Sequence, residues 1–431
     1  MSFNDETSSL MKKRWLIAAA GVIVQLCLGT VYAWSIFKKP MMATHGWSET
    51  TTQGAFMIQS MCFALSVALG GMLIDRKGPR LTGLAGGILF GSGLLLAGYA
   101  NAIGNAGFLY FAYGIIVGLG GGLGYTVPIT TLIKWFPDKR GLVTGLAVMG
   151  YGFGSFIMGN LAPRAILDFG LEKTFTAWGV LSLILVPLGI MFIKNPPSGW
   201  MAQYSLIGKT AVIADSSSFT FSQAVKTWQY WALWLMLFLN VTAGLGFISQ
   251  LSPIAQDIIR QGLGENITEE MLKNIYILSG TIVAIAAIFN GMGRFAWAWF
   301  SDLIGRRTVF MIIFLTQAAG YAIIGHSTGT LMFTCFACYL LACYGGMFST
   351  LPAFTADMFG TVSIGRIYGV IFTAVGLAGV SGPYLFAKVK MMTGSFQTAL
   401  YIESAILLAG FLLIALFKKP KQQRSIEPIP G

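Results

Sequence analysis

Long runs of hydrophobic residues alternate with short polar stretches along the whole chain of 431 residues. A transmembrane helix needs about 20 apolar residues, and the runs have that length. They predict twelve membrane-spanning helices, at residues 15–37, 50–73, 81–101, 107–135, 141–167, 173–194, 229–257, 273–301, 308–326, 329–357, 365–388 and 396–417. We therefore expect an all-α membrane protein with short connections and no large soluble domain.

The longest polar interruption separates the sixth run from the seventh and covers residues 195–228. It opens with the sequence Asn-Pro-Pro-Ser-Gly, and such clusters are typical of loops. The interruption divides the chain into an N-terminal six-helix bundle at 1–194, a cytoplasmic linker at 195–228, and a C-terminal six-helix bundle with a short tail at 229–431.

Composition and charge agree with a membrane protein. Of the residues, 55% are hydrophobic and 10% are charged, against roughly 25% charged in soluble proteins. The net charge of +12 does not indicate a nucleic-acid partner, because the basic residues fall between apolar runs and not on one face. With twelve crossings, both termini and every second connection lie on the same side of the membrane. That side holds 19 Lys and Arg residues, and the connections on the other side hold 8. The positive-inside rule then predicts cytoplasmic termini, in a multi-pass protein of the cytoplasmic (inner) membrane.

A short polar motif occurs twice, between the second and third runs and between the eighth and ninth. Each copy has an aspartate, a short turn, a glycine and basic residues. The residues concerned are Asp75, Arg76, Gly78 and Arg80 in the first copy, and Asp302, Gly305 and Arg306 in the second. A carboxylate can lie against a helix N-terminus while the arginine pairs across the loop. We predict a gating or structural role, and a solvated turn is the alternative. Repeated halves of six helices are the plan of the major facilitator fold.

Arg294 lies alone inside the eighth run, with no acidic residue within seven positions. A guanidinium at membrane depth costs several kcal/mol, and an anionic ligand that arrives from water can compensate for it. Asn290 is four residues earlier and therefore on the same helix face. It can orient the guanidinium or donate to the ligand. The alternatives are an Arg294 that reaches an interface and an Asn290 that caps a backbone kink.

Several motifs carry a resemblance to known transporters. They are Val-Tyr-Ala-Trp-Ser at 31–35, Gly-Gly-Gly-Leu-Gly-Tyr at 120–125, Lys-Trp-Phe-Pro-Asp-Lys-Arg-Gly at 134–141, Gly-Tyr-Gly-Phe-Gly-Ser at 150–155, and Asn290-x-x-x-Arg294. With them the chain resembles the major facilitator superfamily over its whole length. More narrowly, it is similar to the oxalate/formate antiporter family, which is close to the monocarboxylate transporters.

The resemblance implies roles for particular residues. In that family the arginine of helix 8 binds the substrate carboxylate, which assigns this role to Arg294. The oxalate carriers have a second cation, a lysine in helix 11, where this chain has Val375. One cation matches one carboxylate, so we expect singly charged acids. The monocarboxylate transporters have an acidic residue where this chain has Asn290, and a helix 1 lysine linked to proton movement. Here only Lys38 and Lys39 follow the first run, at its outer end.

By the same correspondence a set of aromatic residues lines the substrate cavity. They are Tyr32, Tyr125, Tyr151, Tyr344 and Phe348. A phenol offers an apolar body and a hydroxyl that needs a partner. Helix packing explains any single tyrosine equally well.

These features predict a secondary transporter of small monocarboxylates such as lactate or pyruvate, coupled to a proton and working by alternating access. The alternative is an exchanger of the oxalate/formate type. We expect no enzymatic activity, no cofactor and no metal, since Cys335-x-x-Cys338 lacks a second pair of ligands. The expected partners are a small carboxylate, a proton and the lipid bilayer, and the protein is expected to be a monomer.

Glu403 is a possible proton site, with a packed carboxyl as its alternative. Lys38, Lys39, Lys388 and Lys390 are expected at an outer basic mouth, where they can raise the local concentration of anions. Contact with lipid headgroups is the equally open alternative.

Overall fold

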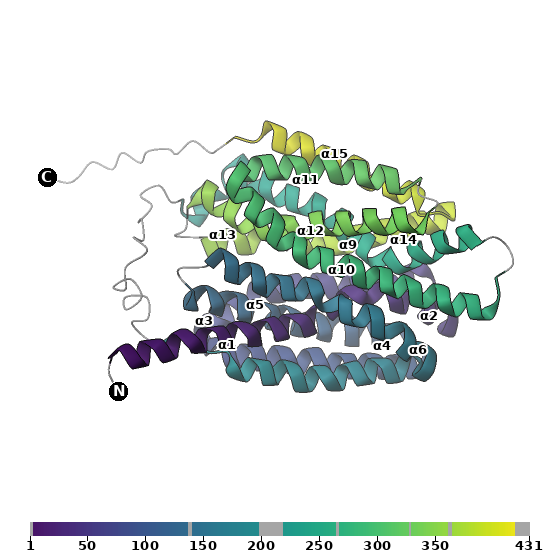
Figure 1. Cartoon of the computed structure of the whole chain (residues 1–431), viewed down its shortest axis with the longest axis horizontal. Helices are drawn as coiled ribbons and strands as arrows, with labels where there is room; N and C mark the ends of the chain where they lie inside the picture. The colour runs from purple at the N-terminus through teal and green to yellow at the C-terminus, as the bar shows by residue number, and fades with distance from the viewer. Residues whose placement is uncertain are drawn as a thin grey trace.

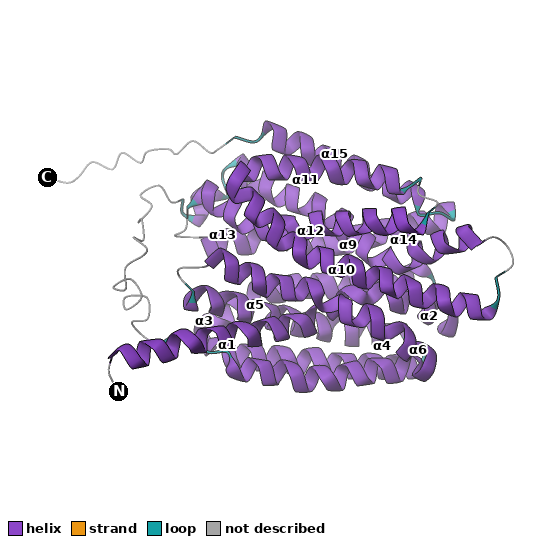
Figure 2. Cartoon of the chain, in the orientation of Figure 1, coloured by secondary structure: helices purple, strands orange, loops and turns teal. Residues whose placement is uncertain are grey.

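The computed structural model describes residues 3–136, 140–197, 219–263, 267–326, 329–360 and 364–418. Within these ranges every regular element is a helix (Figure 2). The helices lie side by side and run back and forth between the two ends of one bundle (Figure 1). The first helix begins and the last helix ends at the same end, which we call the terminal face. The opposite end is called the far face.

The helices of the first half follow one another with short breaks. They are α1 (Phe3–Gly29), the 3-10 helix η1 (Thr30–Ala33), α2 (Trp34–His45), α3 (Glu49–Ala102), α4 (Ala106–Leu109), the π-helix η2 (Tyr110–Val117), α5 (Gly118–Trp135) and α6 (Arg140–Phe192). The helices of the second half are α8 (Phe221–Ala224), α9 (Trp228–Leu263), α10 (Glu269–Ile304), α11 (Arg306–Ile324), α12 (Thr330–Phe359), α13 (Ile364–Ile371), α14 (Thr373–Thr393) and α15 (Gln397–Leu416).

Two of these elements are too long for a single crossing. α3 has 54 residues and α6 has 53, which at a rise of 1.5 Å per residue is roughly 80 Å, against a hydrocarbon core of about 30 Å. Each turns back at a glycine with positive φ, at Gly78 (φ 79°) and at Gly170 (φ 81°). L-residues with a side chain rarely adopt this conformation.

The described residues contain eleven stretches long and apolar enough to cross a membrane. One of them, Gly145–Phe192, has 48 residues and includes the turn at Gly170, so it crosses twice. The prediction of an all-α membrane protein with twelve transmembrane helices is therefore confirmed.

The first crossing is longer than its hydrophobic run. The sequence predicts its end at residue 37, but the helical path continues through η1 and α2 to His45. The prediction that Lys38 lies at an open outer mouth is wrong, because its side chain is fully buried. The apolar run ends at residue 37, before Lys38. The helix continues beyond it because Lys38 has hydrogen-bond partners inside the protein.

The bundle consists of two six-helix halves, as the fold prediction requires. The halves meet mainly along two helix pairs, α6 against α10 and α3 against α14, and α2 also contacts α9. The domain boundaries 1–194, 195–228 and 229–431 stay predictions, and residues 198–218 of the linker lie outside the described residues.

Candidate functional site

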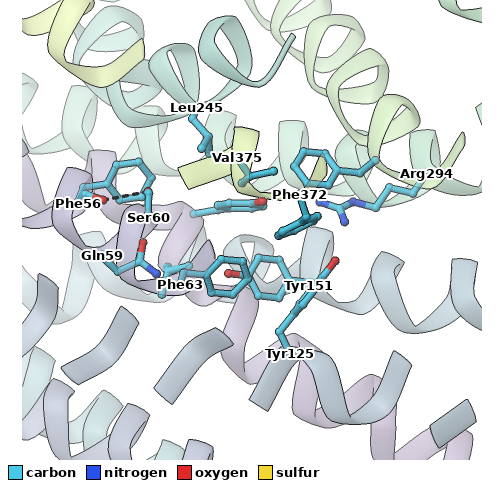
Figure 3. A pocket seen from close by; sticks show the side chains of 13 residues that line it. Phe56, Gln59, Ser60, Phe63, Tyr125, Tyr151, Leu245, Arg294, Phe372 and Val375 are labelled. Atoms are coloured by element: carbon cyan, nitrogen blue, oxygen red, sulfur yellow. Dashed lines mark hydrogen bonds between the residues drawn. The ribbon is translucent and has the colours of Figure 1, made fainter. Parts of the chain in front are cut away.

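A central cavity lies where the two halves meet. Its empty volume, counted with the space that is open to solvent, is about 420 Å³. The first half contributes Val31, Tyr32, Phe56, Gln59, Ser60, Phe63, Tyr125 and Tyr151 to its wall, and the second half contributes Leu245, Arg294, Phe348, Phe372 and Val375. Figure 3 shows Arg294 at one end of the cavity and Gln59 and Ser60 towards the other. Because both halves form the wall, a relative movement of the halves changes access to the cavity.

Arg294 is the only charged side chain among the described residues of this wall. It lies on α10 and is 1% exposed. Its Nε donates to Oδ1 of Asn290 at 3.4 Å, and its Cζ lies 5.4 Å from the ring centroid of Phe348. Within the part of the chain that the structure describes, its second terminal nitrogen, Nη2, has no hydrogen-bond partner. The guanidinium is thus buried and has no carboxylate among its described contacts, and it can accept an anion.

Glycine makes room for this guanidinium at the contact between the halves. A Cβ placed on Gly152 of α6 would lie 2.9 Å from Cα of Gly291 and 3.3 Å from Nε of Arg294. A side chain at position 152 would therefore push α6 away from α10 or displace the arginine. This close approach accounts for one glycine of the glycine-rich run at 150–155.

The structure brings four of the five predicted aromatic residues to the cavity wall, namely Tyr32, Tyr125, Tyr151 and Phe348. Their rings pack edge to face, with centroids 5.1 Å apart for Tyr32 and Tyr151 and 5.2 Å for Tyr125 and Tyr151. Tyr344 is fully buried and lines neither this cavity nor the smaller one beside it. Its hydroxyl lies 3.1 Å from that of Tyr32, so it links α12 to η1 across the two halves.

Asn290 lines the second, smaller cavity, whose empty volume, counted with the space open to solvent, is about 210 Å³. Tyr32 belongs to the walls of both cavities. Asn290 itself is 1% exposed and accepts from Arg294, so it can orient the guanidinium without lining the larger cavity.

Several residues of the cavity wall cannot be predicted from the sequence alone. Phe56, Phe63 and Phe372 look like any other apolar residue of a membrane helix. Gln59 and Ser60 carry a weak signal, since they are adjacent polar residues inside the apolar run at 50–73. Polar residues within a membrane span are often functional.

Val375 lies in the same wall as Arg294 and is 4% exposed. It is the residue that stands where the resemblance expects a second cation. At this point the cavity wall therefore has an aliphatic side chain and not a cation. Among the described residues of the wall, Arg294 alone carries a formal charge.

The repeated loop motif lies at the terminal face, and its described contacts stay within one half. Arg80 donates to the carbonyl of Ile193 at 3.3 Å. Arg306 pairs with Asp302 and lies 3.4 Å from Asp357. Gly78 and Gly305 form the turns with positive φ. Arg76 is exposed, and the side chain of Asp75 lies outside the described residues. Residues 137–139 of the separate motif at 134–141 also lie outside them.

The remaining candidates lie away from the cavity. Glu403 of α15 is fully buried and lines neither cavity. Cys335 is exposed and Cys338 is buried. The described residues hold no group of three or more His, Cys, Asp or Glu residues that could bind a metal ion.

Helical crossings in two halves around a buried, shared cavity define a membrane transporter. The family model of the Major Facilitator Superfamily matches residues 19–383, with a second match at 275–431. The chain belongs to this superfamily, whose members are transporters and not enzymes.

The chain also resembles individual members. It is 27% identical to the uncharacterized MFS-type transporter YhjX of Escherichia coli (strain K12), with 86% of this chain and 87% of that protein covered. It is 27% identical to the oxalate:formate antiporter of Oxalobacter formigenes (98% and 95% covered) and 25% identical to the apicoplast pyruvate carrier 1 of Toxoplasma gondii (98% and 93%). Several vertebrate monocarboxylate transporters also match, among them monocarboxylate transporter 9 of Gallus gallus, at 23% identity, with 93% of this chain and 92% of that protein covered.

Among solved structures, a crystal structure of a single-residue mutant of the nucleoside transporter NupG superposes with a TM-score of 0.67 at 13% identity, covering 94% of this chain and 100% of that one. At this identity the likeness concerns the fold. The predicted kinship with the oxalate:formate antiporter and the monocarboxylate transporters is confirmed.

Proposed function

We propose that this protein carries small organic anions across the cytoplasmic membrane, and that its preferred substrates are monocarboxylates similar to lactate and pyruvate. The observation that carries the proposal is Arg294, a buried guanidinium at the wall of a cavity shared by both halves, with Nη2 unpartnered among the described residues. A carboxylate accepts two parallel hydrogen bonds from a guanidinium, and it would supply the missing counter-ion.

The rest of the wall supports a small substrate with an apolar body. Aromatic and aliphatic side chains surround the guanidinium, and Gln59 and Ser60 add polar groups towards the other end. A short 2-oxo or 2-hydroxy acid has this distribution of groups, with a carboxylate at one end and a neutral polar oxygen beside it. In this proposal Arg294 holds the carboxylate and Asn290 orients the guanidinium, while Tyr32, Tyr125, Tyr151, Tyr344 and Phe348 form or support the wall.

We further propose alternating access of the two halves and coupling to a proton, with the termini on the cytoplasmic side. The relatives that carry pyruvate and other monocarboxylates support the substrate class. Charge matching supports the proton. One bound anion neutralises Arg294, so the loaded carrier has one positive charge fewer than the empty carrier that returns. A proton carried with the anion would balance this difference. A membrane potential of 100 mV is worth about 2.3 kcal/mol per unit charge, so a co-transported ion changes the cycle substantially.

Exchange of two anions is the second candidate function. The relative named oxalate:formate antiporter covers nearly the whole chain and favours it. Val375 speaks against oxalate, because a second carboxylate would face an aliphatic side chain and not a cation.

The test is uptake into proteoliposomes that hold the purified protein. Labelled lactate, pyruvate, formate and oxalate are compared, each with and without a pH gradient and with and without unlabelled anion inside. We expect lactate or pyruvate uptake that needs no internal anion. Uptake of none of the four acids would contradict the substrate class, and uptake only into anion-loaded vesicles would favour exchange.

A further inference from the structure

Lys38 is a second buried cation, and it lies near the far face, at the contact between the two halves. Its side chain is 0% exposed. Its ammonium group donates to Glu49 at the start of α3 and to Gln250 of α9. Gln250 in turn donates through Nε2 to the same oxygen of Glu49 at 3.0 Å. These three residues form a closed triangle, with two members in the first half and one in the second.

A second polar cluster lies beside this triangle on the same two halves. Asp257 of α9 accepts from Lys39 of α2 through one carboxylate oxygen and from Lys390 of α14 through the other, each at 2.9 Å. Lys39 also donates to the carbonyl of Pro253 at 3.4 Å. In addition, the hydroxyl of Tyr276 on α10 donates to the carbonyl of Ile36 at 2.9 Å. Polar contacts therefore tie the halves together on this side of the cavity.

We propose that the Lys38–Glu49–Gln250 triangle and the Lys39–Asp257–Lys390 cluster together form the gate at the far face. In the structure this gate is closed, and it opens when the halves separate at that end. The inference rests on the proposed alternating access, and it assigns that movement to particular side chains.

The arrangement of partners explains how such a gate can open at low cost. Lys38 keeps Glu49 when the halves part, because both belong to the first half. Asp257 keeps Lys390, because both belong to the second half. Within these two clusters, two sets of contacts cross the interface. Gln250 contacts Lys38 and Glu49, and Lys39 contacts Asp257 and the carbonyl of Pro253 on α9. Opening therefore breaks hydrogen bonds and one partly exposed ion pair, and it leaves no buried charge of the clusters without its counter-ion, which would be costly.

The gate is built on the elements that form the cavity. Leu245 of α9 lines the larger cavity, Ile248 and Leu251 of the same helix line the smaller one, and Gln250 lies between them. Tyr32, which lines both cavities, precedes Lys38 by six residues on the same path through η1 and α2. A movement of α9 away from α2 therefore opens the gate and shifts the cavity wall together.

Lys39 and Lys390 offer a matched pair of variants. They bind the two oxygens of one carboxylate at the same distance, and their side chains are 30% and 28% exposed. They differ in the half to which they belong. Lys39→Met removes a contact that crosses the interface, whereas Lys390→Met removes a contact within the second half. The gate is expected to loosen in the first variant and to stay closed in the second.

The experiment measures distances between pairs of spin labels by pulsed electron paramagnetic resonance in lipid nanodiscs, without substrate. The five native cysteines are replaced, and labels are placed at exposed sites of each half. Ile103 and Asn274 report on the far face, and Leu81 and Leu303 report on the terminal face. Lys39→Met and Gln250→Leu should shift the far-face distances to longer values and the terminal-face distances to shorter values. Lys390→Met should match the parent protein.

Equal shifts in Lys39→Met and Lys390→Met, or no shift in Lys39→Met and Gln250→Leu, would overturn the proposal. Gln250→Leu keeps both within-half ion pairs, so it tests the gate even where loss of a lysine impairs folding. The measurement needs no substrate. A failed uptake assay with unchanged gate results would therefore refute the proposed substrate class and leave the gate intact.

Discussion

Arg294 and Lys38 are two cations with almost the same burial and very different surroundings. Their exposed fractions are 1% and 0%. Lys38 is bound by a carboxylate and an amide oxygen. Arg294 has an amide oxygen at 3.4 Å and a phenyl ring, and one of its terminal nitrogens has no partner among the described residues. Burial alone therefore does not point to a substrate site, whereas burial beside a cavity, without a counter-ion among the described contacts, supports the proposed role of Arg294.

The largest expected effect is the loss of transport on removal of Arg294. Two charge-assisted hydrogen bonds to a carboxylate, at about 1.5–3 kcal/mol each, correspond to a loss of roughly 100-fold or more. Arg294→Ala should therefore reduce uptake of the best monocarboxylate to background. Arg294→Lys should also be poor, because lysine lacks the planar fork.

The control for this prediction is stability. Arg294→Ala removes a buried charge that has no counter-ion among its described contacts, so membrane expression and the melting temperature should be kept. Uptake at the wild-type rate by this variant would refute the role of Arg294 as the substrate cation.

The next effect concerns Lys38 and is expected in stability. Lys38→Met leaves Glu49 largely buried without its counter-ion, at a cost of about 3 kcal/mol. Thermal unfolding in detergent should show a clearly lower melting temperature than Arg294→Ala. The double variant Lys38→Met with Glu49→Gln should recover part of the loss. A Lys38→Met protein as stable as the wild type would contradict the prediction that Lys38, unlike Arg294, stabilises the fold.

Val375→Lys would place a second cation in the cavity wall. The variant is expected to bind oxalate, which has two carboxylates, and to transport lactate or pyruvate less well, because one positive charge would stay unneutralised in the loaded state. Competition of unlabelled oxalate with labelled pyruvate measures this change. Val375→Leu serves as the matched control without charge. A wild-type protein that already prefers oxalate would show that charge matching does not set specificity.

A pH gradient should accelerate uptake by a smaller factor. With the interior at about pH 7 and the membrane potential clamped by valinomycin and potassium, acid outside should raise the initial rate, because a proton compensates for the returning charge of the empty carrier. Rates that ignore external pH and rise only with anion loaded inside would favour the exchanger.

The smallest effect is expected for the hydroxyl pair that joins the two halves beside Arg294. Tyr32→Phe removes the 3.1 Å hydrogen bond to Tyr344, worth about 1 kcal/mol, so transport should change by roughly fivefold. Tyr344→Phe should have the same effect, and the double variant should be no worse than either one. Additive losses would mean that the two hydroxyls act separately.

Much of the fold follows from the sequence because a bilayer imposes a length on each span. Twelve apolar runs were enough to predict twelve crossings, and the prediction was wrong mainly at ends. The first crossing continues to His45 because Lys38 and Lys39 find partners within the protein. Hydrophobicity records what a residue prefers in isolation and cannot include such partners.

The sequence by itself also identified Arg294, since an unaccompanied charge inside an apolar run is a local property. Only the tertiary structure decided which charges are paired. Lys38 meets Gln250 from 212 positions away, and Lys390 meets Asp257 from 133 positions away. The same packing places Gln59, Phe372 and Val375 around one cavity. The cost of a buried charge depends on the groups that folding brings to it, and helices far apart in the chain supply those groups.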